Sequence, residues 1–168
     1  MLSPVTNLRF FASCFMLMAL VLPARAQKNE PPSGQFGVGI YAATGAPSGL
    51  EGTYAISENM QVGTLFSLGL SSGGGESSTT FLLAPYFRYL FSSAVSPFVQ
   101  GGLSIISSGG STNAGIFMGG GLAYYLSRRL GIHADVDIID VTFSNPSILA
   151  FGWSNVRIGL DWFFSQNR

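Results

Sequence analysis

Charged residues are scarce in this chain of 168 residues and make up 10% of it. An ordinary soluble domain contains about 25%. Acidic and basic residues balance to a formal net charge of zero, and Lys28 is the only lysine. Because nucleic acids and other strongly charged partners select proteins with an excess of one sign of charge, this composition does not suggest a nucleic-acid partner.

Cysteine is nearly absent, and the only one, Cys14, lies in an N-terminal segment with the pattern of a secretory signal peptide. Arg9 supplies a positive charge, residues 10–22 form an apolar core, and Ala24-Arg25-Ala26 is a small-residue cleavage site. We predict that residues 1–26 are removed on export; an uncleaved N-terminal anchor is the alternative. The mature chain would then have no cysteine, which excludes disulfides and thiol chemistry.

Long hydrophobic runs and helical periodicity are missing from the rest of the chain. No later segment approaches the ~20 consecutive apolar residues that a transmembrane helix needs. Residues 27–34 are polar and contain proline, so we expect an irregular leader. From residue 35 onward, segments rich in β-branched and aromatic residues alternate with clusters of Gly, Ser, Asn and Pro, which is typical of strands and turns. Eight strands are expected, at residues 35–43, 50–57, 60–70, 80–91, 97–107, 115–127, 130–141 and 151–164.

The strand lengths and the connections indicate a barrel that spans a membrane. A tilted strand needs about 9–11 residues to cross a bilayer. Tight connections alternate with longer ones rich in Gly, Ser and Asn, and the longer ones fall at residues 44–49, 71–79, 108–114 and 142–150. We therefore predict an all-β domain at residues 35–168: an eight-stranded antiparallel up-and-down transmembrane β-barrel whose polar lumen is filled by side chains.

The positions of the charges indicate which face of each predicted strand points into the barrel. Successive residues of a strand face opposite sides of a sheet, and each predicted strand has one apolar face and one face with charged and small residues. The charged residues on the less apolar faces are Glu51, Arg88, His133, Asp135, Asp137, Arg157 and Asp161. Asp140 alone falls in the apolar register, where a charge requires either a place at the rim or a bulge that shifts the register.

A soluble barrel also alternates, so the alternation alone does not separate the two classes. In a soluble barrel the charges point outward and are scattered among many Lys and Glu residues. This chain is too poor in charge to cover an exterior that faces water. The reverse arrangement, apolar outside and polar inside, is the better interpretation, and a secreted soluble barrel that binds a small apolar ligand is the alternative.

Aromatic residues gather at one end of the predicted strands. Aromatic rings collect at membrane interfaces because they are largely apolar and one edge tolerates water. We predict an aromatic belt at the periplasmic interface, formed by Phe36, Tyr89, Phe91, Phe98, Tyr124, Trp162 and Phe164.

With these features the sequence resembles the small outer-membrane β-barrel proteins of double-membraned bacteria, the OmpA/OmpX-like superfamily. The resemblance rests on the segments APYFRYLF, SPFVQGGL and FMGGGLAYYLSRRLGIHADV and on the closing GLDWFF, and it covers residues 35–164. It implies contact with outer-membrane lipid and delivery by periplasmic chaperones to the outer-membrane assembly machinery. Such barrels commonly end on an aromatic residue that this machinery reads, whereas here SQNR follows Phe164.

The charged residues of the polar faces predict an ionic network inside the barrel. An eight-stranded barrel is just wide enough for its interior side chains to fill it, and buried charges need partners. We expect this network to be structural, without a cofactor or metal. A metal site at His133, Asp135 and Asp137 is the less favoured alternative, because same-strand residues two apart lie about 6.5–7 Å from each other.

The function expected from these features is a structural or surface-interaction role in the bacterial envelope, with neither a wide pore nor an enzymatic activity. The alternative from another class is a lipid-modifying barrel enzyme. It would pair His133 with a nucleophile such as Ser104 or Ser154, although no third residue completes such a site.

Overall fold

The structure of the protein is a computed structural model that describes residues 33–73, 76–91, 95–144 and 148–164, with the backbone alone at residues 71–73, 76, 77, 150, 153 and 154. The predicted signal peptide, most of the predicted leader and the tail after Phe164 lie outside the described residues. In the described part, no helix is long and apolar enough to cross a membrane.

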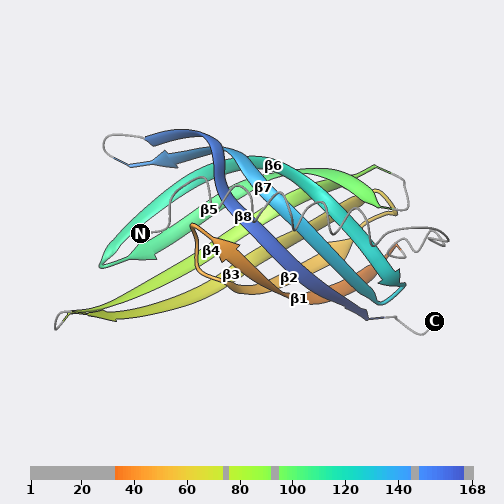
Figure 1. Ribbon diagram of the computed structural model, residues 1–168, viewed down its shortest axis with the longest axis horizontal. Coiled ribbons are helices and arrows are strands. Elements are labelled where there is room, and N and C mark those ends of the chain that lie inside the picture. Colours follow the sequence, from red (N-terminus) through yellow and green to blue (C-terminus); the bar gives the residue numbers. More distant parts are fainter. Residues whose placement is uncertain (1–32, 74–75, 92–94, 145–147, 165–168) are drawn as a thin grey trace, which may run out of the picture.

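Eight antiparallel strands close into one barrel, in which each strand pairs with the next and β1 pairs with β8 (Figure 1). The predicted fold class, an eight-stranded up-and-down barrel, is confirmed. The strands are β1 (Gln35–Thr44), β2 (Gly49–Ala55), β3 (Met60–Gly73), β4 (Glu76–Leu90), β5 (Ser96–Ser108), β6 (Ser111–Ser127), β7 (Leu130–Phe143) and β8 (Ile148–Phe164).

The two ends of the barrel differ in shape. At the end that we call the turn end, short connections join β2 to β3, β4 to β5 and β6 to β7. At the opposite end, the arm end, the pairs β3–β4, β5–β6 and β7–β8 project as hairpins beyond the connection of β1 to β2 (Figure 1). Residues 44–49 connect β1 to β2 much as predicted, but the other three pairs run further than predicted.

These hairpin arms are built from sequence that we expected to form loops, and in the β3–β4 and β5–β6 arms that sequence is polar. Residues 71–73 pair with residues 76–78, and Ser107 pairs with Thr112. Serine and threonine add side-chain hydrogen bonds between the strands, such as Thr80 Oγ1 with Ser108 Oγ at 2.9 Å. The change to polar composition therefore marks the end of the apolar wall, and the strands continue past it.

A bulge in β7 resolves the anomalous position of Asp140. Ile138 has no partner on either neighbouring strand, and the register of β7 shifts there against both β6 and β8. Beyond the shift, Asp140 lies on the same side as Asp137, because Asn155 Nδ2 is 3.1 Å from a carboxylate oxygen of Asp137 and 3.5 Å from one of Asp140. A register shift was one of the two solutions that the sequence allowed for this aspartate.

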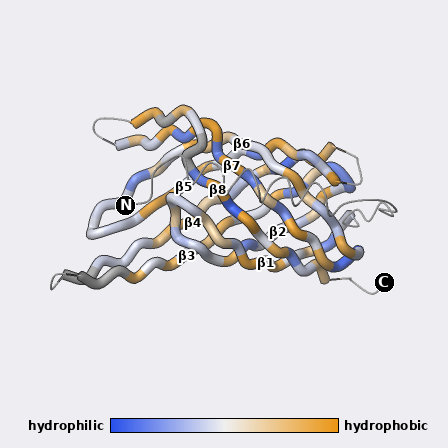
Figure 2. Tube along the Cα trace, viewed as in Figure 1, coloured by the Kyte–Doolittle hydropathy of each residue, from blue (hydrophilic) through white to orange (hydrophobic). Residues whose placement is uncertain are grey.

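Along the strands, apolar residues alternate with polar or small ones (Figure 2). Most of the large apolar side chains face outward, as shown by Ile40, which is 61% exposed, and Ile158, which is 54% exposed. The charged side chains of the strands' polar faces point into the barrel. A water-soluble barrel has the opposite distribution, with its apolar residues in the interior.

Most of the predicted belt residues lie on the outer wall near the turn end. Tyr124 is half-buried there, and the exposed members, each 40–51% exposed, are Phe36, Tyr89, Phe91, Trp162 and Phe164. Phe98 does not belong to this group, so its assignment to the belt was wrong. It is 2% exposed and faces the lumen, because β5 turns Pro97 and Val99 outward.

Candidate functional site

All seven charged residues assigned to the polar strand faces are enclosed in the lumen, where each is 1–6% exposed. They come from β2, β4, β7 and β8, so barrel closure is needed to bring them together. We call this set the lumenal network; its members are Glu51, Arg88, His133, Asp135, Asp137, Arg157 and Asp161.

One part of the lumenal network is centred on Arg157. Asp135 lies directly opposite Arg157 in the β7–β8 pair, and its Oδ1 is 2.7 Å from Arg157 Nε. The Nη1 and Nη2 atoms donate to the two oxygens of Asp137 at 2.7 and 2.5 Å. This two-pronged contact is the strongest geometry available to a guanidinium and a carboxylate. Arg157 therefore connects two acidic residues of the neighbouring strand.

A second part of the network surrounds Glu51, across the lumen from β7. Arg88 Nη2 lies 3.3 Å from Glu51 Oε1, and the Tyr86 hydroxyl donates to the same oxygen. The guanidinium of Arg88 also lies over two aromatic rings, 4.4 Å from the Phe98 centroid and 4.9 Å from that of Tyr86. Such stacking attracts a desolvated cation to the ring face. Phe98 thus contributes to the lumen instead of the membrane interface.

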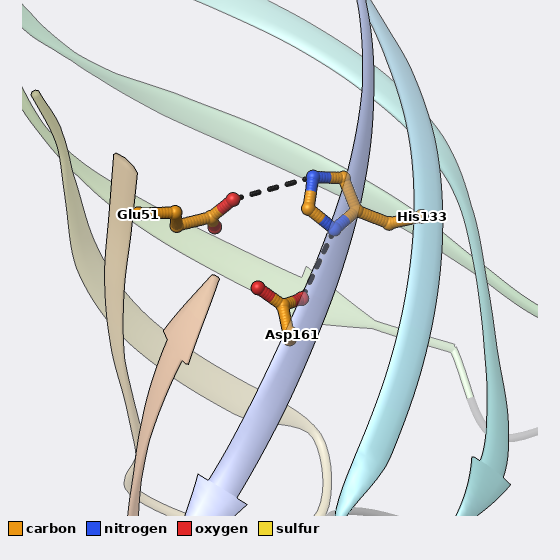
Figure 3. Close-up of side chains that lie close together, drawn as sticks. All are labelled: Glu51, His133 and Asp161. Atoms are coloured by element: carbon orange, nitrogen blue, oxygen red, sulfur yellow. Dashed lines mark hydrogen bonds and ion pairs between the residues drawn. The ribbon is translucent and has the colours of Figure 1, made fainter. Parts of the chain in front are cut away.

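His133 links this second part of the network to β8 (Figure 3). Its Nδ1 is 3.0 Å from Asp161 Oδ2 and its Nε2 is 3.3 Å from Glu51 Oε2. Asp135 Oδ2 lies 3.7 Å from Nε2. The ring is therefore surrounded by carboxylates from three different strands.

Glycines on the lumenal faces provide the space for these side chains. Gly159 lies opposite His133, and a Cβ at that position would be 2.5 Å from His133 Nε2. Gly39 pairs with Glu51 on one side and with Asp161 on the other, so its missing side chain lets these two carboxylates approach each other. The small residues of the polar faces thus leave the room that the large polar side chains fill.

Apolar side chains border the lumenal network on both sides. Toward the turn end lies a buried cluster, which we call the turn-end plug, made of Leu90, Phe98, Ala123, Tyr125 and Phe163. On the side of the arms lies a second cluster, made of Tyr41, Leu65, Leu82, Ala84, Tyr86 and Phe117. The described part of the lumen is therefore occupied by side chains along its length.

The geometry changes two sequence-based judgements about His133. The distance argument against shared coordination was too strict, because the His133 and Asp135 side chains converge to 3.7 Å although they share a strand, while Asp137 binds Arg157. The enzyme alternative required a serine, but the polar groups that lie against the His133 ring among the described residues are the carboxylates of Glu51, Asp135 and Asp161. The side chain of Ser154 lies outside the described residues.

Comparison with known proteins adds information about the fold. No family model and no curated protein matches the sequence. Among solved structures, the N-terminal β-barrel domain of Pseudomonas aeruginosa OprF superposes with a TM-score of 0.58 at 15% identity, covering 79% of this chain and 98% of that domain. Neisserial surface protein A (NspA) superposes with a TM-score of 0.51 at 16% identity, covering 77% of this chain and 95% of that protein. The E. coli outer membrane protein W superposes with a TM-score of 0.52 at 16% identity, covering 79% of this chain and 99% of that protein.

At these identities the likeness is one of architecture. It extends over nearly the whole of each compared chain, and it agrees with the closed order of strands. The chain therefore has the fold of the small eight-stranded β-barrels of the bacterial outer membrane.

Proposed function

We propose that this protein is an integral protein of the bacterial outer membrane, with a structural or surface-interaction role in the envelope and no wide pore. The observation that carries the proposal is the distribution of side chains, with large apolar residues on the outer wall and buried charges in the lumen. In water, a continuous apolar wall of this kind would be a liability for association. In a bilayer, the same wall matches the hydrocarbon around it.

The orientation follows from the aromatic residues and the arms. Outer-membrane barrels have short periplasmic turns and longer extracellular connections. The exposed aromatics near the turn end would then lie at the periplasmic interface, and the arms would stand at the cell surface. We include in the proposal export through a cleaved segment at residues 1–26, passage with periplasmic chaperones and insertion by the outer-membrane assembly machinery.

The closed lumen supports a role other than diffusion. Phe98 and Phe163 of the turn-end plug are 2% and 1% exposed, and the network above them is held by ion pairs. An eight-stranded barrel is just wide enough to be filled in this way. The arms, which carry exposed residues such as Leu70, at 85% exposed, and Phe151, at 80%, are then the part available for surface contacts.

One hollow of the described structure lies on the outer wall, so it does not favour a barrel that encloses a small apolar ligand. This hollow of about 360 Å³ lies beside the β7 bulge and is lined by residues that include Phe87, Val99, Met118 and Ile138. These side chains face outward, so in the proposed setting the hollow is open to lipid.

Membrane fractionation and gel mobility test the proposal. We expect the full chain, expressed in a double-membraned bacterium, to fractionate with the outer membrane and to migrate differently before and after boiling. In planar bilayers the purified protein should give no large, stable channel currents. Recovery in the aqueous periplasmic fraction would contradict the membrane location, and a persistent wide-pore conductance would contradict the closed lumen.

A further inference from the structure

The lumenal network contains more negative than positive charge. Its members are four carboxylates, two guanidinium groups and one imidazole, so it has two excess negative charges when His133 is neutral. Buried charge without compensation is strongly unfavourable in a medium of low dielectric constant. The excess equals the charge of one divalent cation.

The unsatisfied atoms in the lumen point to where such a cation would lie. Glu51 Oε1 accepts hydrogen bonds from Tyr86 and Arg88, whereas Glu51 Oε2 accepts none and only faces His133 Nε2 at 3.3 Å. Asp161 Oδ2 faces His133, whereas Asp161 Oδ1 likewise accepts none. Both residues are more than nine-tenths buried. Each carboxylate therefore has one oxygen that accepts no hydrogen bond, and both carboxylates lie beside the same imidazole (Figure 3).

These three side chains also lie close enough to share an ion after a small movement of their side chains. One donor atom from each of Glu51, His133 and Asp161 lies within 4.8 Å of the others. Asp161 Oδ2 faces Nδ1 of His133 at 3.0 Å and Glu51 Oε2 faces Nε2 at 3.3 Å, so the two carboxylates approach different ring nitrogens. Ligands in a tetrahedral site with bonds of about 2.0–2.2 Å lie ~3.3–3.5 Å apart, so the three donor atoms would have to close in by up to about 1.5 Å to share an ion at one ring nitrogen. One imidazole with two carboxylates is a donor set that suits zinc and related first-row divalent ions.

We propose that Glu51, His133 and Asp161 form a site for a divalent transition metal of the zinc class inside the barrel. One ring nitrogen of His133 and one oxygen from each carboxylate bind the ion. Arg88 holds the other oxygen of Glu51, and Gly39 and Gly159 leave the space in which the ligands meet. The proposal goes beyond the envelope role above, because a metal-free barrel would still be closed and embedded in the membrane.

The test uses the full chain, refolded into detergent micelles with zinc or with a chelator. Because the turn-end plug and the second cluster enclose the site, zinc is supplied before folding. His133 is the only histidine, so ¹⁵N-histidine labelling reports on this ring alone. We expect one zinc per chain after dialysis and a ring with one metal-bound nitrogen, which reverts in the chelated sample.

Variants distinguish zinc that is coordinated by the three ligands from zinc that is only attracted by the negative charge of the lumen. Glu51→Gln and Asp161→Asn should lower zinc affinity at least about tenfold. Asp137→Asn removes a lumenal negative charge without touching a ligand and should lower affinity clearly less than the two ligand variants do, with gel mobility reporting folding in each case. If a variant fails to fold, the ¹⁵N-histidine spectrum of the unmodified chain still shows whether His133 binds zinc. A ring protonated on both nitrogens and unchanged by zinc, with no metal retained, would overturn the site and leave an imidazolium paired with the carboxylates.

Discussion

At the scale of single residues, the lumen combines the largest polar side chains with the smallest residues. Arg157 reaches two aspartates because β7 places them on one face, two residues apart, and His133 lies over a glycine of the next strand. The alternation of residues predicted which side chains face inward. It did not predict the contact of Glu51 with His133, because β2 and β7 are not neighbours and meet only across the closed lumen.

Arg157→Leu tests the ionic pairing within the lumen. The substitution leaves Asp135 and Asp137 without their main cationic partner, so we expect the free energy of unfolding to fall by about 3–5 kcal/mol. Urea titration of the refolded protein in micelles measures this loss. Arg128→Leu, in an exposed turn, is the matched control and should stay within about 0.5 kcal/mol. Equal effects of the two substitutions would show that the pairing contributes nothing.

Gly159→Ala tests whether lumenal glycines provide space. The new Cβ would meet the His133 ring, and overpacking of this kind costs about 1–3 kcal/mol. Gly52→Ala is a suitable control on the outer wall, since its Cβ would lie no closer than 3.9 Å to a neighbour. Equilibrium unfolding should show a loss for Gly159→Ala and little change or a small gain for Gly52→Ala. The opposite order would exclude a spacing role for Gly159.

At the scale of the strands, alternation succeeds where the two faces differ and fails where they do not. In β4, Arg88 between Phe87 and Tyr89 identifies the inner face unambiguously. In β5, Pro97, Phe98 and Val99 are all apolar, and Phe98 was placed outside. The signal that was missed is the parity of Phe98 with the polar Ser96 and Gln100, which share its inner face. The β3–β4 and β5–β6 arms were missed for a different reason, because their serine and threonine residues read as loop sequence but continue the strand pairing and add side-chain hydrogen bonds.

Phe98→Ala tests the inward orientation in β5. Removal of a buried ring from the turn-end plug should cost about 3–5 kcal/mol. Val99→Ala, on the outer face of the same strand, should cost roughly 1 kcal/mol, because it removes only a small apolar contact. Unfolding of the two variants under the same conditions gives the comparison. A larger loss for Val99→Ala would place Phe98 back on the outer wall.

An arginine substitution separates the membrane-spanning part of a strand from its arm. Ile158→Arg puts a charge on the outer wall of β8 and should cost about 2–4 kcal/mol in liposomes, whereas Thr112→Arg on the β5–β6 arm should cost about 0–1 kcal/mol. Folding titrations in liposomes measure both. A similar cost at the two positions would mean that the arm is as deep in the lipid as the wall.

At the scale of the whole molecule, the sequence was sufficient to predict the number of strands, their order and the inward orientation of the charged side chains. These features follow from strand period and from the cost of placing charge in hydrocarbon, both of which act residue by residue. The second apolar cluster and the convergence around His133 depend on how the closed barrel directs side chains across its lumen. That geometry has no counterpart in the spacing of residues along one strand.

The measurement that best distinguishes this inside-out barrel from a soluble one is fluorescence quenching in liposomes. With Cys14→Ser as background, single cysteines at Ile40, Leu103, Ile158 and Thr112 would each carry an environment-sensitive fluorophore. We expect brominated lipid to quench the first three, and aqueous iodide to quench Thr112 alone. Equal iodide quenching at all four positions would show that water, and not hydrocarbon, covers the apolar wall.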